Sequence, residues 1–268
     1  ATLAALLSAT PGQPLRPPAF LNLTSLTLVA ASSTTLSRPD ASFLFLFLSN
    51  APRLTALRVS YAQTGLTHFA ASSQPTSLPF RLRTYVVEPL FDGFEQPLLC
   101  SRGTLRSLSV RFFPDVYERQ RALVSALHHS GGTLRELSIM RFVPLSAALE
   151  VLPQSAVHMV AACPRLERLA LDTRGTADAD VLRALFLAVG APLHGLSMIL
   201  RPRVWHSTER EFIGTMLRLL RIRSLSSLRR LAISTPDYIL ADRAAFAPLE
   251  AYCTIRKIKF SLSLVGDS

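Results

Sequence analysis

The sequence predicts an α/β fold: a right-handed solenoid, or horseshoe, with a parallel sheet on the concave side and helices and loops on the convex side. Two observations predict it. A short apolar phrase returns nine times along 268 residues, at intervals of 23 to 35 residues, and the stretches between the phrases have helical periodicity. Repetition at such a period is typical of a solenoid, in which each unit buries its apolar face against its neighbours.

Each copy of the phrase has apolar residues at its first, fourth and sixth positions. Because the fourth and sixth positions alternate with variable ones, the phrase predicts a short strand with one buried face. Two copies also match beyond the apolar positions, since residues 101–112 read SRGTLRSLSVRF and residues 130–142 read SGGTLRELSIMRF. The first residues of the nine phrases are Leu23, Leu54, Leu82, Leu105, Leu134, Leu166, Leu193, Leu228 and Ile255.

The stretches between the phrases predict helices, because their apolar residues fall on one helical face. The pattern is strongest at 178–190 and 207–222, and Gly190 suits a left-handed helix stop. Weaker patterns lie at 42–50, 116–129, 145–162 and 243–251. The short gap after Leu82 predicts a loop or a single turn, and the long gap after Leu193 predicts a loop around Trp205. Strand, turn, helix and turn in repetition place parallel strands on one side and helices on the other.

The phrase and its spacing resemble the leucine-rich repeat family, in its long-repeat variety, over residues 20–262. The divergent repeats are most similar to those of F-box/leucine-rich-repeat proteins. This resemblance implies a protein-protein interaction scaffold and, as a finer expectation, the substrate-recognition part of an F-box-type ubiquitin-ligase subunit whose F-box lies outside this chain. The Asn or Cys that the family places three residues after the last apolar position is absent here. Residues 1–19 are expected to be the tail of a preceding repeat or an N-terminal flank, and residues 263–268 a C-terminal tail.

The net charge of +11, from 29 basic and 18 acidic residues, indicates a partner with an acidic surface, either a protein or a nucleic acid. Almost all of the basic residues are arginine, with lysine only at 257 and 259, so the excess is either functional or compositional. No basic run is interleaved with aromatic residues as in a nucleic-acid platform. A protein partner is therefore favoured, with an arginine-rich nucleic-acid-associated scaffold as the alternative.

The sequence contains no phosphate loop, nucleophile elbow or metalloprotease motif. We therefore expect no enzymatic activity, no cofactor, no catalytic metal and no small-molecule substrate, and no apolar run is long enough to predict a membrane span. Cys100, Cys163 and Cys253 are an odd number without metal-ligand spacing, and each precedes a strand phrase. They predict free, buried thiols and an intracellular location, cytoplasmic or nuclear.

The residues that could carry specificity are the variable ones of each phrase, because strand alternation sends side chains away from the core. Arginine and aromatic side chains together are typical of interface hot spots. The predicted partner-binding residues are Arg58, Tyr61, Arg111, Phe112, Arg141, Arg168, Asp172, Arg230, Lys257 and Lys259. Arginine also fills the second position in five of the nine phrases, where a structural role and a partner-binding role are both open. These five residues are Arg83, Arg106, Arg135, Arg229 and Arg256.

Overall fold

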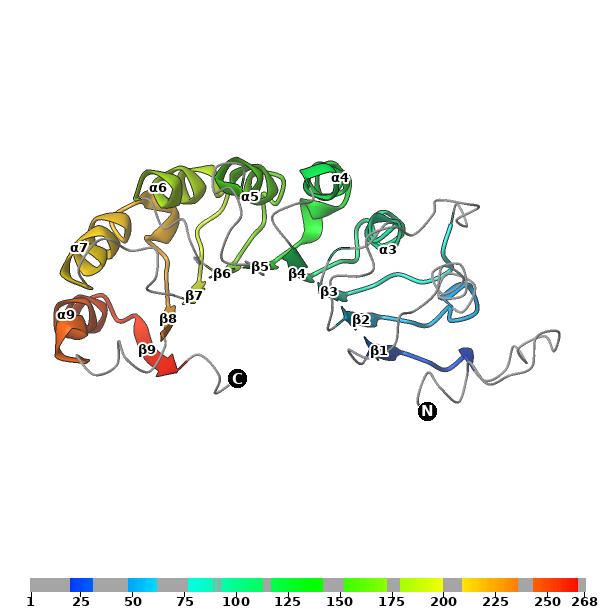
Figure 1. Cartoon of the computed structure of the whole chain (residues 1–268), viewed down its shortest axis with the longest axis horizontal. Helices are drawn as coiled ribbons and strands as arrows, with labels where there is room; N and C mark the ends of the chain where they lie inside the picture. The colour runs from blue at the N-terminus through cyan, green and yellow to red at the C-terminus, as the bar shows by residue number, and fades with distance from the viewer. Residues whose placement is uncertain are drawn as a thin grey trace.

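Nine strands form one parallel sheet, and each strand pairs with the next one along the chain. The computed structural model describes residues 20–30, 48–61, 77–88, 90, 93–112, 117–141, 152–172, 179–199, 209–235 and 243–264. The strands line the inner side of an arc and the helices cover its outer side (Figure 1). The predicted fold class, a leucine-rich-repeat solenoid, is therefore confirmed by the topology. The strands are β1 (Ser25–Ala30), β2 (Ala56–Tyr61), β3 (Thr84–Glu88), β4 (Ser107–Phe112), β5 (Glu136–Arg141), β6 (Arg168–Asp172), β7 (Gly195–Ile199), β8 (Arg230–Thr235) and β9 (Lys259–Leu264).

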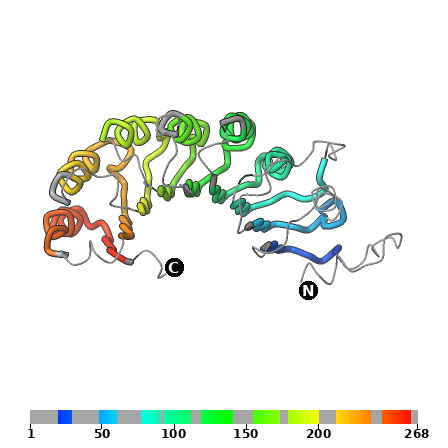
Figure 2. Tube along the Cα trace, viewed as in Figure 1, coloured from blue at the N-terminus to red at the C-terminus, as the bar shows by residue number. Residues whose placement is uncertain are grey.

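The helices follow one another along the convex side, and each contacts its neighbours in the order of the chain. The trace in Figure 2 shows strand and helix alternating around the arc. The described helices are α3 (Glu95–Cys100), α4 (Tyr117–Ser130), α5 (Leu152–Ala161), α6 (Ala179–Ala188), α7 (Glu209–Leu219) and α9 (Ala247–Ile255). The described 3-10 turns are η2 (Gly131–Thr133), η4 (Arg223–Leu225) and η5 (Arg243–Phe246). The gap after Leu82 holds a short helix, α3, where a loop or single turn was expected. The predicted loop around Trp205 and most of the predicted helix at 42–50 lie outside the described residues.

The core lies between the sheet and the helices, and the strand register builds it. Leu108 of β4 pairs with Leu137 of β5, which pairs with Leu169 of β6, and Leu169 pairs with Leu196 of β7. All four leucines are at most 2% exposed. The first-position leucines of the central repeats are fully buried beside them. Each repeat therefore completes its core with side chains of the repeats on either side, as a solenoid requires.

Threonine hydroxyls also connect consecutive repeats. Thr104 Oγ1 donates to the Leu82 carbonyl at 2.9 Å, and Thr133 Oγ1 donates to the Leu105 carbonyl at 2.9 Å. Each threonine immediately precedes the first leucine of its phrase and reaches the first leucine of the phrase before it. The repeated Gly-Thr-Leu-Arg sequence thus satisfies backbone carbonyls between consecutive repeats.

The register predicted for the ninth phrase is wrong by two residues. Ile255, expected as its first core residue, is the last residue of α9 and is 80% exposed. Phe260 pairs with Leu231, so Phe260 occupies the fourth position and Lys257 the first. A shift of two residues preserves the alternation of faces, which is why the sequence pattern could not distinguish the two registers.

Helix α9 ends in a hydrogen-bonded cap that explains the shift. The Ile258 N–H donates to the Cys253 carbonyl at 2.8 Å and the Lys257 N–H donates to the Thr254 carbonyl at 3.1 Å. This is the Schellman pattern, with Lys257 in the left-handed position at φ 56°. Lys257 therefore lies in the turn before β9 and not on the strand, where it was predicted to bind a partner.

Two glycines allow neighbouring repeats to approach closely. A Cβ atom on Gly131 would lie 2.4 Å from the Ala162 carbonyl oxygen, and one on Gly190 would lie 3.2 Å from Pro164 Cα. Gly190 does not have the left-handed conformation expected for a helix stop. Glycine fits here instead because a side chain would make a tight contact with the backbone of the preceding repeat.

Candidate partner-binding face

The third, fifth and seventh positions of the strands face away from the helices, and we call the surface that they form the concave face. Its middle row, the fifth positions of β4 to β9, consists of small residues. These are Ser109, Ser138, Ala170, Ser197, Ala232 and Ser261. Such a floor lets a partner approach the sheet backbone, and it offers hydroxyl groups for hydrogen bonds. The prediction had considered only large side chains and missed this row.

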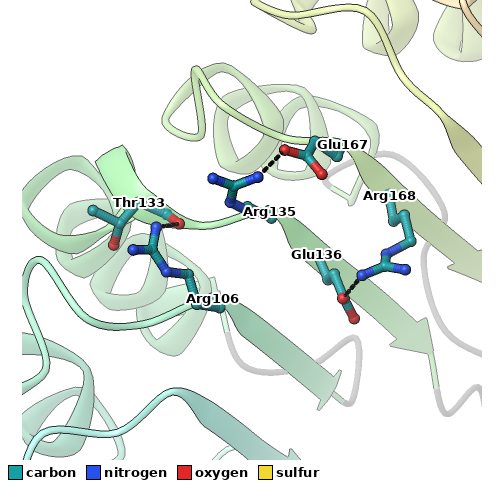
Figure 3. A network of polar contacts seen from close by, with 6 residues as sticks. All are labelled: Arg106, Thr133, Arg135, Glu136, Glu167 and Arg168. Atoms are coloured by element: carbon teal, nitrogen blue, oxygen red, sulfur yellow. Dashed lines mark hydrogen bonds and ion pairs between the residues drawn. The ribbon is translucent and has the colours of Figure 1, made fainter.

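Two ion pairs connect β5 and β6 at the edge of the concave face where the strands begin (Figure 3). Arg135 pairs with Glu167, and Glu136 pairs with Arg168. The order of charges is reversed between the two strands, Arg-Glu in one repeat and Glu-Arg in the next, so the correct register brings opposite charges together twice. All four side chains are at least one third exposed, so each pair stabilises the fold by at most about 1 kcal/mol.

These contacts bear on the arginines of the second position, for which two roles were open. Arg135 is held by Glu167 of the next repeat, and Arg106 Nη1 donates to the Thr133 carbonyl at 3.2 Å (Figure 3). Both side chains therefore connect adjacent repeats. Arg168, predicted to bind a partner, lies on the concave face but is already paired with Glu136.

Glu88 of β3 lies between two predicted partner-binding arginines. Its carboxylate is 3.6 Å from Arg58 Nη2 of β2 and 3.9 Å from Arg111 Nη2 of β4. The glutamate side chain is 10% exposed, whereas Arg58 and Arg111 are 53% and 40% exposed. Sequence reasoning missed Glu88 because its burial depends on side chains from two other repeats. The only signal in the sequence is the seventh position of Glu88 in its phrase, which places it on the concave face.

The last two repeats carry the cations that are least compensated. Arg230 of β8 lies directly opposite Lys259 of β9, and both are exposed and without an ion pair in the part of the chain that the structure describes. Like charges opposite each other weaken strand pairing. Arg229 and Arg256 are exposed beside them, and Arg256 lies 5.9 Å from the centre of the Tyr252 ring. Lys259 at the start of the edge strand β9 also disfavours edge-to-edge association.

Four other residues were predicted to bind a partner, and all four lie in the second half of their strands. Asp172 is half-buried at the end of β6, on the concave face. Tyr61, Phe112 and Arg141 are the last residues of β2, β4 and β5, and their side chains lie outside what the structure describes. All three occupy the eighth position of the phrase, and strand alternation assigns this position to the same side as the buried fourth and sixth positions. Alternation therefore does not support a partner-binding role for them, as it does for the other predicted residues.

The thiols are free, as predicted, but only Cys163 and Cys253 are fully buried. Cys100 is half-buried, contrary to the prediction, and its sulfur accepts from the Leu78 N–H at 3.3 Å. Burial raises the pKa of Cys163 to about 12. The pKa of Cys253 is raised to about 11 by burial and by the nearby charge of Glu250. Both thiols are therefore protonated at neutral pH, and a protonated thiol is a poor nucleophile and metal ligand.

The described residues hold no group of three or more His, Cys, Asp or Glu side chains that could bind a metal ion. A cavity of about 320 Å³ lies on the convex side between α6 and α7. Its lining includes Arg183, Arg218 and Arg221, of which Arg218 donates to Thr215 at 3.1 Å.

No protein-family model matches the sequence, and no curated protein matches it. Among solved structures, the chain is similar to the leucine-rich repeat-containing protein LegL7 from Legionella pneumophila, at 12% sequence identity over 91% of this chain and 83% of that chain, with a TM-score of 0.37. The fold assignment rests on the strand register and the sheet topology of this chain. None of the described helices is both long and apolar enough to span a membrane.

Proposed function

We propose that this protein is a non-enzymatic scaffold that binds another protein on the concave face of its sheet. The observation that carries the proposal is the continuous face itself, which runs across nine parallel strands, with small residues along its middle row from β4 to β9 and cationic side chains around this row. Solenoids use such extended faces for binding. Of the predicted residues, the proposal keeps Arg58, Arg111, Arg168, Asp172, Arg230 and Lys259, and it favours a partner with an acidic surface.

A finer proposal is that the chain recognises substrates for an F-box-type ubiquitin ligase, inside the cell. The resemblance of its divergent repeats to those of F-box/leucine-rich-repeat proteins supports it. The ligase core would then be a second partner, bound through an F-box outside this chain. The test is to express the full-length protein and to ask whether the ligase core co-purifies with it. A full-length protein that lacks an F-box would exclude this assignment.

The proposal of protein binding is tested by reversing charge on each side of the arc. Arg230→Glu with Lys259→Glu changes the concave face, and Arg183→Glu with Arg221→Glu changes the convex side. Proteins captured from lysate are quantified by mass spectrometry beside a thermal melt of each variant. We expect the concave variant to lose specific partners and the convex variant to retain them, with melting temperatures near that of the wild type, because exposed substitutions usually change stability by only about 0.5 kcal/mol. The reverse pattern of capture would place the binding site on the convex side.

A nucleic-acid partner is the second candidate, and the uncompensated cations at the third positions of β8 and β9 favour it. The dependence of affinity on salt separates the two candidates. Binding to a nucleic-acid backbone falls steeply with salt concentration, because each phosphate contact releases counterions. A flat salt dependence with single-stranded and double-stranded nucleic acids would exclude this candidate.

A further inference from the structure

We propose that Arg58, Glu88 and Arg111 form an anion-binding notch on the concave face, which accepts one acidic side chain of the protein partner. This inference rests on the proposed function and specifies the chemistry of one contact. Each of the three residues comes from a different strand, β2, β3 and β4, so the notch exists only when three consecutive repeats are packed together. Arg58 pairs with Val86, two residues before Glu88, and Val87 pairs with Val110, so the notch runs diagonally from the middle of β2 to the carboxyl ends of β3 and β4.

The arrangement of the three side chains leaves hydrogen-bond donors available. The Glu88 carboxylate lies 3.6 and 3.9 Å from the two guanidinium groups, beyond ordinary hydrogen-bond length. Neither guanidinium donates a hydrogen bond within the described residues, and Arg111 Nε is buried without a partner there. The two Nη2 groups lie 3.6 and 3.9 Å from the same Glu88 oxygen, Oε2, so an incoming carboxylate that approaches this point can accept hydrogen bonds from both guanidinium groups.

The charge of the notch also favours an anion. Two guanidinium groups and one carboxylate leave a net charge of +1, and the carboxylate is the least exposed of the three. Glu88 offsets part of the repulsion between the two arginines, but its carboxylate is a like charge to any anion that enters, so the attraction comes from the two guanidinium groups.

The surroundings fit one anionic group better than a polymer of phosphates. Beyond Arg111, the seventh positions of the next three strands are Met140, Asp172 and Ile199, and Arg168 at the start of β6 is paired with Glu136. Among the side chains that the structure describes, no row of free cations therefore continues from the notch across β5 and β6, as a nucleic-acid backbone would need. A carboxylate of Asp or Glu and the phosphate of a modified serine share the chemistry that the notch accepts.

The test uses the protein labelled with ¹⁵N-arginine, in which the Nε–Hε resonances report on each guanidinium. Glutarate and inorganic phosphate are titrated separately at constant ionic strength. We expect saturable shifts of the Arg58 and Arg111 resonances, with those of the ion-paired Arg168 and the convex Arg183 unchanged. Saturation by glutarate identifies a carboxylate as the ligand, and saturation by phosphate alone identifies a phosphorylated side chain. Equal shifts of all arginines, or none that saturate, would overturn the proposal.

Two substitutions and one control define the notch. Arg111→Gln should abolish the saturable shift of Arg58. Glu88→Gln should tighten anion binding about threefold or more, because it removes one like charge a few ångströms from the anion. Arg168→Gln is the matched control and should change neither result. Weaker binding by Glu88→Gln would refute the arrangement, and because the titration needs no protein partner, its outcome is independent of the capture experiment above.

Discussion

Gly131→Ala tests whether neighbouring repeats pack as closely as the structure shows. The new Cβ would lie 2.4 Å from the carbonyl oxygen of Ala162 and 3.2 Å from Cys163 Sγ, against about 3.4 Å for an ordinary contact. The oxygen belongs to the backbone at the end of the next repeat's helix and cannot rotate away, so the two repeats must separate by about 1 Å. Overpacking of this kind costs roughly 1–3 kcal/mol. Alanine recovers part of that cost, about 0.4–1 kcal/mol, by restricting the unfolded chain.

The matched control is the adjacent glycine. A Cβ on Gly132 would have no atom within 4 Å, so Gly132→Ala should leave the stability unchanged or raise it slightly. The assay is urea denaturation of both variants and the wild type, followed by circular dichroism. We expect the free energy of unfolding of Gly131→Ala to fall by about 1–2 kcal/mol. Equal stabilities of the two variants would show that the repeats are not in contact at this point.

Three further predictions address the core, the last turn and the thiols. Leu137→Ala should destabilise the protein by roughly 2–5 kcal/mol in the same urea assay, because the side chain is 1% exposed, while Ser138→Ala on the concave face should be nearly neutral. Lys257→Gly should stabilise the protein by about 0.5–1 kcal/mol, because glycine adopts the left-handed φ of 56° without strain. Lys259→Gly, in the strand that follows, is the control and should destabilise the protein. If both variants lower the midpoint of urea denaturation, the turn geometry is wrong. Burial raises the pKa of Cys163 from 9.0 to about 12, so the stability contributed by its protonated thiol is complete below about pH 9 and is lost as the pH rises toward 12. Cys163→Ala should therefore flatten the decline of the melting temperature at alkaline pH. An unchanged profile would contradict the burial of this thiol.

The repeating fold could be predicted because its signal is local. A phrase with three apolar positions is both the strand and the core of each repeat, so eight of the nine registers follow from the spacing of leucines. The ninth failed because Ile258, Phe260 and Leu262 alternate along one face of the strand, so two registers fit the fourth and sixth positions, and Ile255 supplied the apolar first residue expected for the wrong one. The hydrogen-bonded cap that ends α9 at Ile255 decides the register, and a lysine in the left-handed position gives no sequence signal for such a cap.

The candidate site was predicted only in part, because pairing between repeats is not visible in one phrase. Strand alternation correctly placed Arg58, Arg111 and Arg230 on the concave face. The alternation could not show that Arg168 is neutralised by Glu136, or that Glu88 lies buried between two arginines. These contacts join residues about 30 positions apart, and their geometry depends on how closely the repeats pack.

The most direct test of the central claim is to map which side of the arc a bound partner touches. A photo-crosslinking amino acid is placed at Ser138 on the concave face or at Leu187 of α6, which is 63% exposed on the convex side. After irradiation in lysate, the crosslinked proteins are identified by mass spectrometry. We predict that a specific partner is crosslinked from position 138 and not from position 187. Crosslinks of the same partner from position 187 alone would contradict the proposal that the concave face is the binding surface.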